Sequence, residues 1–443
     1  MVTNFQSHYI PNTIAEQDDL LAAVGLSSVD ELFADIPDDY RNPPLRLPDP
    51  MSELEIQREL GAMAGRNRPL SSGPSFLGAG SYYHFIPSIV KAVMTRGEFL
   101  TAYTPYQPEV SQGTLQVIFE FQTMVSALYG MEVANAGMYD GATSLAEAVL
   151  MACRVTRRQQ VVVSDAVAPA YRQVIATYCQ AQGIAIDIVP TVDIGASVTE
   201  ATAGVVAQYP NFYGGLDDLA GLAATAHDDG ALLVVSADPL AMGMLRPPGE
   251  FGADIVTGEG QPIGIPPSFG GPYLGLFSCK QQYIRQMPSR LVGRTTDTQG
   301  RSGYVLTLQT REQHIRRERA TSNICTNEAL YALASTIYLA AMGRQGLRQV
   351  AELCYHKAHY AASAIAGLDG YSLPQSGPFF QEFVVSCPES PGKINRRLME
   401  RHNILGGLDV SDRFENGMLL CVTEMNTRAE IDSLVSALAE TGQ

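Results

Sequence analysis

The stretch Ala231-Leu-Leu-Val-Val-Ser-Ala-Asp238 joins a short apolar run to a carboxylate. A second apolar run closes Phe251-Gly-Ala-Asp-Ile-Val256, and a loop rich in Gly and Pro then ends at Phe269-Gly-Gly-Pro272. Short apolar runs bounded by turn residues are typical of fully buried strands. This stretch therefore predicts two buried strands, the first of which ends beside an acidic side chain.

The same pattern extends over the middle of the chain. Amphipathic stretches such as Ala168–Ala181 and Leu216–His227 have helical periodicity and separate the apolar runs. Alternation of this kind predicts an α/β fold with a mostly parallel sheet covered by helices. The expected strands are Val161–Val163, Ile184–Val189, Gly204–Gln208, Ala231–Val235, Ile255–Val256 and Tyr273–Phe277.

The lysines have an unusual distribution, since none occurs between Lys91 and Lys280. In α/β enzymes that use pyridoxal phosphate, an acidic residue after a strand pairs with the pyridine nitrogen and a lysine holds the cofactor. Here the loop shows Gln261-Pro262, and neither residue supplies the primary amine that an imine requires. We therefore expect this chain not to bind the cofactor covalently.

Lys280 could reverse that expectation. It follows the apolar run Tyr273–Phe277 and opens the polar run Lys280-Gln-Gln. This setting fits a solvent-facing helix start better than a desolvated catalytic amine. An autonomous pyridoxal-phosphate enzyme that uses Lys280, such as a transaminase or decarboxylase, stays as one alternative.

Composition limits the classes of function. The chain has 443 residues, 46% of them hydrophobic, and a formal net charge of -16, which disfavours nucleic acid and anionic membrane surfaces as partners. The N-terminus lacks the features of a signal peptide and no apolar stretch is long enough to span a bilayer. The seven cysteines have no metal-ligand spacing and are interpreted as buried thiols, so we expect no metal and a soluble, cytoplasmic protein.

Three parts are expected along the chain. Residues 1–65 form a helical arm and linker, because Thr13, Ser28 and Ser52 each precede a glutamate at capping-box spacing and the segment 41–50 is rich in proline. Residues 66–326 form the large α/β domain. Residues 327–443 form a connecting helix and a small α+β domain, with its last helix from Thr427.

The loop Tyr103–Gly113 presents several hydrogen-bonding side chains on a backbone stiffened by prolines. Rigid polar loops often line a site, although a well-packed connection with half-buried tyrosines is an equal reading of the composition. Its candidate site residues are Tyr103, Tyr106, Gln107, Glu109, Ser111 and Gln112.

Three other features have weaker signals. Gly141-Ala-Thr143 lies at an expected helix start, where free amides favour an anion such as phosphate, although Gly and Thr also begin ordinary helices. His84 follows Ser81-Tyr-Tyr and is interpreted as structural. Arg311, Arg316, Arg317 and Arg319 could hold an anion, but neighbouring glutamates favour a solvated or interface helix.

Longer motifs add a resemblance. Four stretches closely resemble the alpha chains of the two-subunit glycine cleavage system P-protein family, the decarboxylating glycine dehydrogenases. The resemblance runs essentially from end to end. Its motifs are Tyr9-Ile-Pro-Asn-Thr13, the run from Arg96 to Thr114, Met138-Tyr-Asp-Gly-Ala-Thr143 and Thr321-Ser-Asn-Ile-Cys-Thr-Asn327.

The resemblance implies a fold-type-I, pyridoxal-phosphate-transferase-like architecture with a seven-stranded type of sheet. It implies that the beta chain, glycine dehydrogenase subunit 2, holds the cofactor on a lysine at the position that Gln261-Pro262 fills here. The complex would decarboxylate glycine, release carbon dioxide and pass the aminomethyl group to the lipoyl arm of the H-protein, in an α2β2 assembly. No residue of this chain is then expected to be catalytic or cofactor-binding by itself, and Gly141, Thr143, Asp238, Gln261 and Pro262 mark a vestigial cofactor pocket.

Within this reading the loop Tyr103–Gly113 is the segment expected to complete the active site of the complex, because a rigid polar loop suits a closed pocket. The alternative is a purely structural or regulatory subunit that contributes no atoms to the active site.

Overall fold

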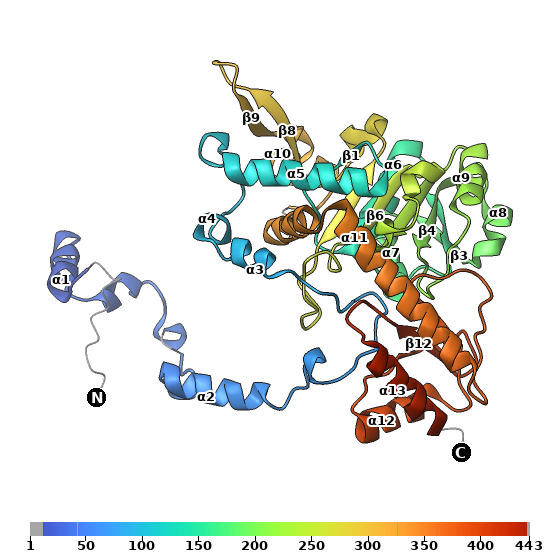
Figure 1. Ribbon diagram of the computed structural model, residues 1–443. Helices are drawn as coiled ribbons and strands as arrows, with labels where there is room; N and C mark the ends of the chain where they lie inside the picture. The colour runs from blue at the N-terminus through green and yellow to red at the C-terminus, as the bar shows by residue number, and fades with distance from the viewer. Residues whose placement is uncertain (1–11, 42, 326, 441–443) are drawn as a thin grey trace. The chain divides into compact units, whose positions relative to one another are not determined.

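The computed structural model describes residues 12–41, 43–325 and 327–440. The motif positions 9–11 lie outside the described residues. The chain divides into two compact units, Met1–Arg68 and Pro69–Gln443. Figure 1 shows the order of their elements.

The first unit is a series of short helices without a core of its own. No described residue up to Arg68 is buried. Thr13 and Ser52 form the expected capping boxes, but Ser28 does not, because the Ser27 hydroxyl donates to Glu31 and a 3-10 helix forms instead. The elements are α1 (Ile14–Ala23), 3-10 helices Val29–Phe33 and Asp38–Tyr40, and α2 (Glu53–Ala64).

A seven-stranded sheet forms the centre of the second unit. Its strand order is β1-β7-β6-β5-β4-β2-β3, and all neighbours run parallel except β6 with β7 and β7 with β1. The expected mostly parallel sheet is confirmed. The strands are β1 (Val133–Ala134), β2 (Gln160–Ser164), β3 (Ala185–Val189), β4 (Thr202–Tyr209), β5 (Leu232–Ala237), β6 (Ile255–Glu259) and β7 (Gly275–Cys279).

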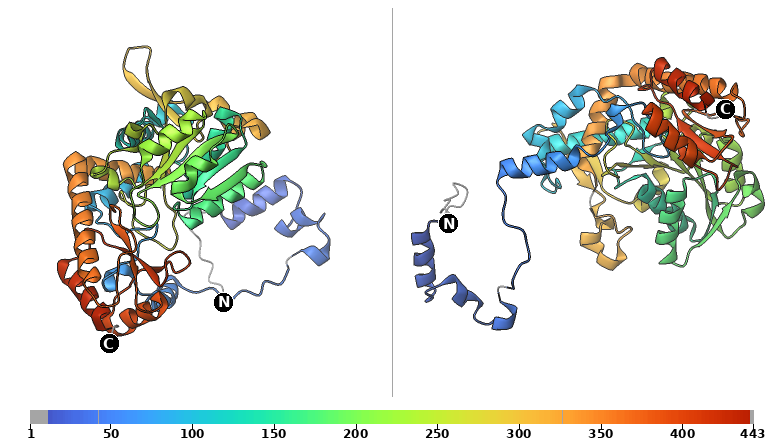
Figure 2. Two further views of the ribbon diagram at one scale, coloured as in Figure 1. Left: turned by 90° about the vertical axis from the view of Figure 1, so that its right-hand side faces the viewer. Right: turned by 90° about the horizontal axis from the view of Figure 1, so that it is seen from below.

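Both faces of the sheet are covered, which explains why its strands read as continuous apolar runs. Leu233 and Val235 of β5 pack with α5, α9 and α11, whereas Leu232 and Val234 pack with α6. Figure 2 shows these layers. The helices are α3 (Ser88–Met94), α4 (Gly97–Leu100), α5 (Gln112–Tyr129), α6 (Gly141–Thr156), α7 (Pro169–Gln180), α8 (Ile194–Ser197), α9 (Leu219–Asp228), α10 (Gln313–Arg316) and α11 (Ala329–Ala366).

The long helix α11 joins the sheet region to the small α+β elements. Gly343 has non-helical dihedral angles (φ 60°, ψ -178°) and interrupts α11 with a kink. An antiparallel sheet of order β10-β12-β11 follows, and its core includes the C-terminal part of α11. These elements are β10 (Glu382–Ser386), α12 (Pro391–His402), β11 (Leu408–Asp409), β12 (Gly417–Cys421) and α13 (Arg428–Ala439).

One hairpin was not predicted from the sequence. It pairs β8 (Leu291–Thr296) with β9 (Ser302–Thr307) and packs a few apolar side chains, including Val292 and Leu306, against α5. The remaining positions are mostly Arg, Thr, Ser and Gly, so the ribbon lacks the apolar signal of a buried strand. Within the described residues, no helix combines the length and apolar character needed to cross a membrane.

The start of α13 allows a simple test of the helix boundaries. Thr427 accepts a hydrogen bond from the Glu430 amide (3.2 Å), and Glu430 in turn accepts from the Thr427 amide (2.7 Å). We expect Thr427→Ala to lower the free energy of unfolding by about 1 kcal/mol, because the cap is lost. Thr427→Ser keeps the hydroxyl and should stay close to the wild type in chemical denaturation. Equal losses for both variants would contradict this role.

Candidate functional site

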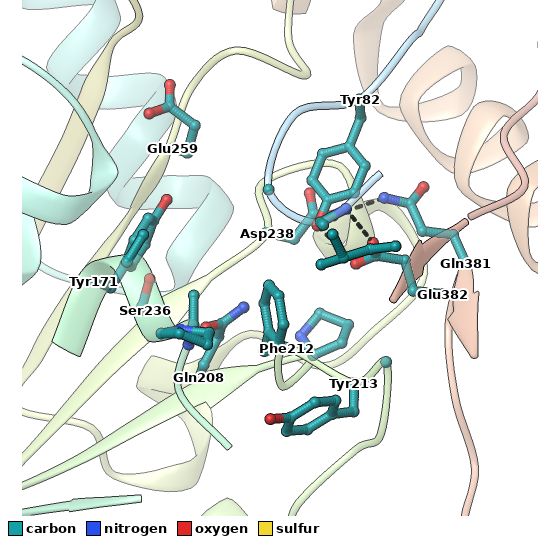
Figure 3. A pocket seen from close by; sticks show the side chains of 18 of the residues that line it. Tyr82, Tyr171, Gln208, Phe212, Tyr213, Ser236, Asp238, Glu259, Gln381 and Glu382 are labelled. Carbon is teal, nitrogen blue, oxygen red and sulfur yellow. Dashed lines mark hydrogen bonds between the residues drawn. The ribbon is translucent and has the colours of Figure 1, made fainter. Parts of the chain in front are cut away.

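A cavity of about 400 Å³ lies at the carboxyl ends of the parallel strands. Gln208 of β4, Ser236 of β5 and Glu259 at the end of β6 line it, together with Asp238. In Figure 3, Glu259 and Tyr171 lie on one side of the cavity, across from Tyr82, Asp238, Gln381 and Glu382. Ligands of open α/β sheets bind at this end of the strands, so the position is that of a ligand site.

Asp238 lines the cavity but is fully engaged with its own chain. One carboxylate oxygen accepts the Leu240 amide (2.8 Å), and the other accepts the Gln381 side-chain amide (3.2 Å). Burial raises the pKa of Asp238, against a smaller lowering by His84. The carboxylate therefore fastens the turn after β5 to the strand region of the small α+β sheet.

Gln261 lies behind the cavity wall and is buried. Its side-chain oxygen accepts the Tyr82 amide (2.8 Å), and its nitrogen donates to the carbonyls of Tyr82 (2.8 Å) and Ile265 (2.7 Å). The position at which the sequence suggested a missing lysine is thus used to clamp the backbone of Tyr82. Pro262 lines the cavity beside it.

The segment that carries Tyr82 forms one wall of the cavity. The Tyr82 hydroxyl and the Ala79 amide both donate to Glu382, at 2.8 and 2.6 Å. These donors lower the pKa of Glu382, but burial outweighs them and raises it to about 7. His84 pairs with Glu424 at 2.7 Å at the end of this segment, which agrees with the structural role expected for it.

The helix start at Gly141 is occupied by side chains of the chain itself. The Thr143 amide donates to Asp140 (2.7 Å), and the Gly141 amide donates to Glu259 (2.9 Å). Glu259 also accepts the amides of Gln261 (2.9 Å) and Leu274 (3.1 Å). Glu259 lines the cavity and accepts the Gly141 amide, whereas neither Gly141 nor Thr143 is among the lining residues.

The charges of the cavity are of one sign. Among the described residues that line it, none is Lys, Arg or His. Its carboxyl groups belong to Asp238, Glu259, Glu382, Asp409 and Asp412. Pyridoxal phosphate needs an amine for its aldehyde and donors for its phosphate, so the residues present do not fit this cofactor.

Lys280 does not supply the missing amine. Its Nζ donates to Asp254 (2.6 Å) and to the Gly252 carbonyl (3.3 Å), and it is not among the residues that line the cavity. Asp254 is buried and also accepts the Leu233 amide. The amine therefore pairs a buried carboxylate at the far end of the strands, instead of projecting into solvent as the sequence suggested.

The second group of candidate residues lies elsewhere, on the loop that precedes α5. Tyr103 is 90% exposed and Tyr106 is 46% exposed, and Gln107 and Glu109 are exposed as well. Ser111, at the end of the loop, is half-buried. Tyr103 is thus open to solvent, whereas Tyr106 is about half buried and its hydroxyl is bonded to Arg290, as the alternative reading expected.

Gln112 fixes the end of this loop. Its side-chain nitrogen donates to the carbonyls of Pro108 and Tyr304, both at 2.8 Å, and its oxygen accepts the Tyr304 amide at 2.9 Å. These bonds tie the loop to strand β9.

A buried arginine holds the other side of the loop. Arg290 donates to the Tyr106 hydroxyl (3.2 Å) and to the Cys325 carbonyl (2.7 Å), and it pairs with Glu312 at 3.6 Å. A small cavity of about 170 Å³ lies here. Tyr103 and Arg290 line it, together with residues of α5 and α11. The residues that line it are different from those that line the larger cavity.

Two expectations about side chains need correction. Six cysteines are buried, but Cys325 is exposed because it lies on the irregular segment before α11. The arginine-rich segment is not one helix. Arg311 turns inward, donating to backbone carbonyls that include Ser289 (3.0 Å), while α10 spans only Gln313–Arg316.

Sequence reasoning missed two residues that decide the chemistry of the larger cavity, Glu259 and Glu382. Tyr82 belongs to the cluster Ser81-Tyr-Tyr-His84, which could offer aromatic walls but was interpreted as structural, and it does line the cavity. Glu259 carried a local signal, because it is a carboxylate at the end of an apolar run, two positions before Gln261.

The sheet order, the small α+β sheet and the position of the cavity define the class of protein: a chain with the fold-type-I, pyridoxal-phosphate-transferase-like fold. The structure of sphingosine-1-phosphate lyase from Burkholderia pseudomallei has this fold, with a TM-score of 0.65 over 91% of this chain and 93% of that chain, at 17% identity. A crystal structure of glycine decarboxylase (P-protein) of the glycine cleavage system, in inhibitor-bound form, is more similar. It has a TM-score of 0.93 and 45% identity over 98% of this chain and 100% of that chain.

The chain belongs to the glycine cleavage system P-protein family, whose model matches residues 7–438. It is 53% identical to the probable glycine dehydrogenase (decarboxylating) subunit 1 of Thermomicrobium roseum, over 98% of this chain and 99% of the relative. The subunit 1 of Desulforamulus reducens is 52% identical over 97% and 99%. The present chain therefore has the role of the alpha subunit of a multi-subunit enzyme.

Proposed function

We propose that this chain completes the active site of a glycine-decarboxylating complex whose pyridoxal phosphate is held by a second subunit. The complex removes the carboxyl group of glycine as carbon dioxide and transfers the remaining aminomethyl group to the lipoyl arm of an H-protein. The names of the relatives and their nearly complete coverage support the reaction. A cytoplasmic location is part of the proposal, because free thiols suit a reducing compartment.

One observation supports the assignment of the cofactor to a second subunit: the residues in and directly behind the wall of the larger cavity. Gln261 stands at the expected lysine position and uses its amide on the backbone of Tyr82. The Gly141 amide is taken by Glu259. A chain with this cavity needs a partner to supply the cofactor, and the cofactor supplies the electron sink for decarboxylation.

The contribution of this chain to the reaction is assigned to the loop Tyr103–Gly113. Two features support this assignment. The side chains of Tyr103, Tyr106 and Gln107 are open to a partner, and both ends of the loop are fixed, by Gln112 on one side and Arg290 on the other. A rigid loop positions polar groups without the entropy cost of ordering a mobile one. Its residues would orient substrate and exclude water in the assembled complex.

Exchange of labelled bicarbonate into glycine, with lipoylated H-protein present, tests this function. We expect no exchange with this chain alone and rapid exchange once the second subunit is added. Exchange at an undiminished rate by the second subunit without this chain would contradict the proposed completion of the active site. Exchange by this chain alone would favour the autonomous enzyme instead.

A further inference from the structure

Helix α6 has 16 residues and begins at Gly141, whose amide donates to the cavity residue Glu259. Such a helix start favours negative charge, because its first amides lack partners within the helix. Here the partner of the Gly141 amide is the carboxyl group of Glu259, at 2.9 Å. The anion position is thus filled from within the chain.

Two further backbone amides donate to the carboxyl group of Glu259. The amides of Gln261 and Leu274 reach the second carboxyl oxygen of Glu259 at 2.9 and 3.1 Å. Three backbone donors from three separate segments therefore converge on one carboxyl group: the start of α6, the loop after β6 and the residue before β7. Several backbone amides directed at one point favour an anionic or strongly accepting group there, and in this chain Glu259 is that group.

The start of α6 is also tightly packed around Gly141. A Cβ atom at Gly141 would lie 2.5 Å from the Tyr171 hydroxyl and 3.0 Å from the Glu259 Cβ. A phosphate group cannot share this position with Glu259. Among the described residues, the remaining lining offers no cationic side chain that could hold a phosphate group elsewhere in the cavity.

We propose that Glu259 is a built-in substitute for a phosphate group, and that it closes the cavity of this chain to phosphate-bearing ligands. The proposal is independent of the role assigned to the loop Tyr103–Gly113. Burial raises the pKa of Glu259 to about 8 against the lowering by its three amide donors.

The test removes the carboxyl group and asks whether free phosphate takes its place. In Glu259→Ala the amides of Gly141, Gln261 and Leu274 lose their acceptor. Inorganic phosphate should then raise the melting temperature in a saturable way, with at least a tenfold tighter apparent affinity than in the wild type. Potassium chloride at the same ionic strength serves as the salt control. Glu250→Ala is the matched charge control, because Glu250 is exposed and pairs with Arg246.

Glu259→Gln keeps the shape of the side chain and should remain insensitive to phosphate. If Glu259→Ala does not fold, Glu259→Ser replaces it, and restoration of its folding by phosphate but not by chloride supports the proposal. Two results would overturn it. One is a saturable response of the wild-type protein to phosphate. The other is a folded Glu259→Ala or Glu259→Ser variant that binds phosphate no more tightly than the wild type does.

Discussion

Replacing Tyr106 with Phe and Gln107 with Ala together should lower the turnover of the assembled complex by about 100-fold, the size of effect that follows when positioned groups are lost near reacting atoms. Tyr106 is already held in place, because its hydroxyl accepts a hydrogen bond from Arg290 at 3.2 Å and its ring centre lies 5.4 Å from that of His314. A preorganised side chain acts without rearrangement, so its loss should appear in kcat and not only in KM.

The measurement compares turnover at saturating glycine and H-protein, after gel filtration has shown that the subunits assemble normally. Tyr360→Phe is the matched control, because it removes a tyrosine hydroxyl that donates to Asp432 at 2.6 Å on the surface of the small α+β elements. Full turnover by a correctly assembled Tyr106→Phe/Gln107→Ala complex would contradict the completing role of the loop. It would favour a purely structural or regulatory subunit.

The second large effect concerns pH and Glu382. Burial raises the pKa of this carboxyl group from 4.5 to about 7, so the folded chain binds its proton more tightly than the unfolded chain does. Its contribution to stability is therefore fully present below about pH 4.5 and is lost as the pH rises through 7. A shift of this size corresponds to about 3 kcal/mol. Glu259, whose pKa is raised to about 8, acts in the same direction and extends the loss to higher pH.

Glu382→Gln should remove this part of the pH dependence, since an amide cannot ionise and its oxygen can still accept the Ala79 amide. Chemical denaturation between pH 5 and pH 8.5 should show a shallower decline for the variant than for the wild type. Glu250→Gln, at an exposed position, should keep the wild-type slope. Identical slopes for Glu382→Gln and the wild type would show that Glu382 is ionised in the folded chain throughout this range.

Much of the fold was accessible from local patterns. Buried parallel strands read as apolar runs because both faces of the sheet are covered, and the last helix, expected from Thr427, begins there, with Thr427 as the N-cap of α13. The hairpin β8–β9 was not predicted, because only a few of its side chains are buried. Ser28 failed as a helix cap because Ser27, one residue earlier, engages the same glutamate.

The larger cavity shows the limits of sequence reasoning more clearly. The replacement of a lysine by Gln261 could be predicted from the chain alone, since it depends only on which residue types can form an imine. What Gln261 does instead could not, because its partner Tyr82 lies 179 positions earlier in the chain. Likewise, Gly141 was a candidate anion site with an ordinary helix start as the alternative, and only the fold brings Glu259 to it.

The most direct test of the central claim is the visible absorbance of pyridoxal phosphate mixed with this chain alone, with the second subunit alone and with both. The account predicts that this chain alone gives no band of bound cofactor, and that borohydride reduction of the complex attaches cofactor only to the second subunit. A stable band from this chain alone, with the cofactor mapped to Lys280 after reduction, would contradict the account and identify an autonomous cofactor-binding enzyme.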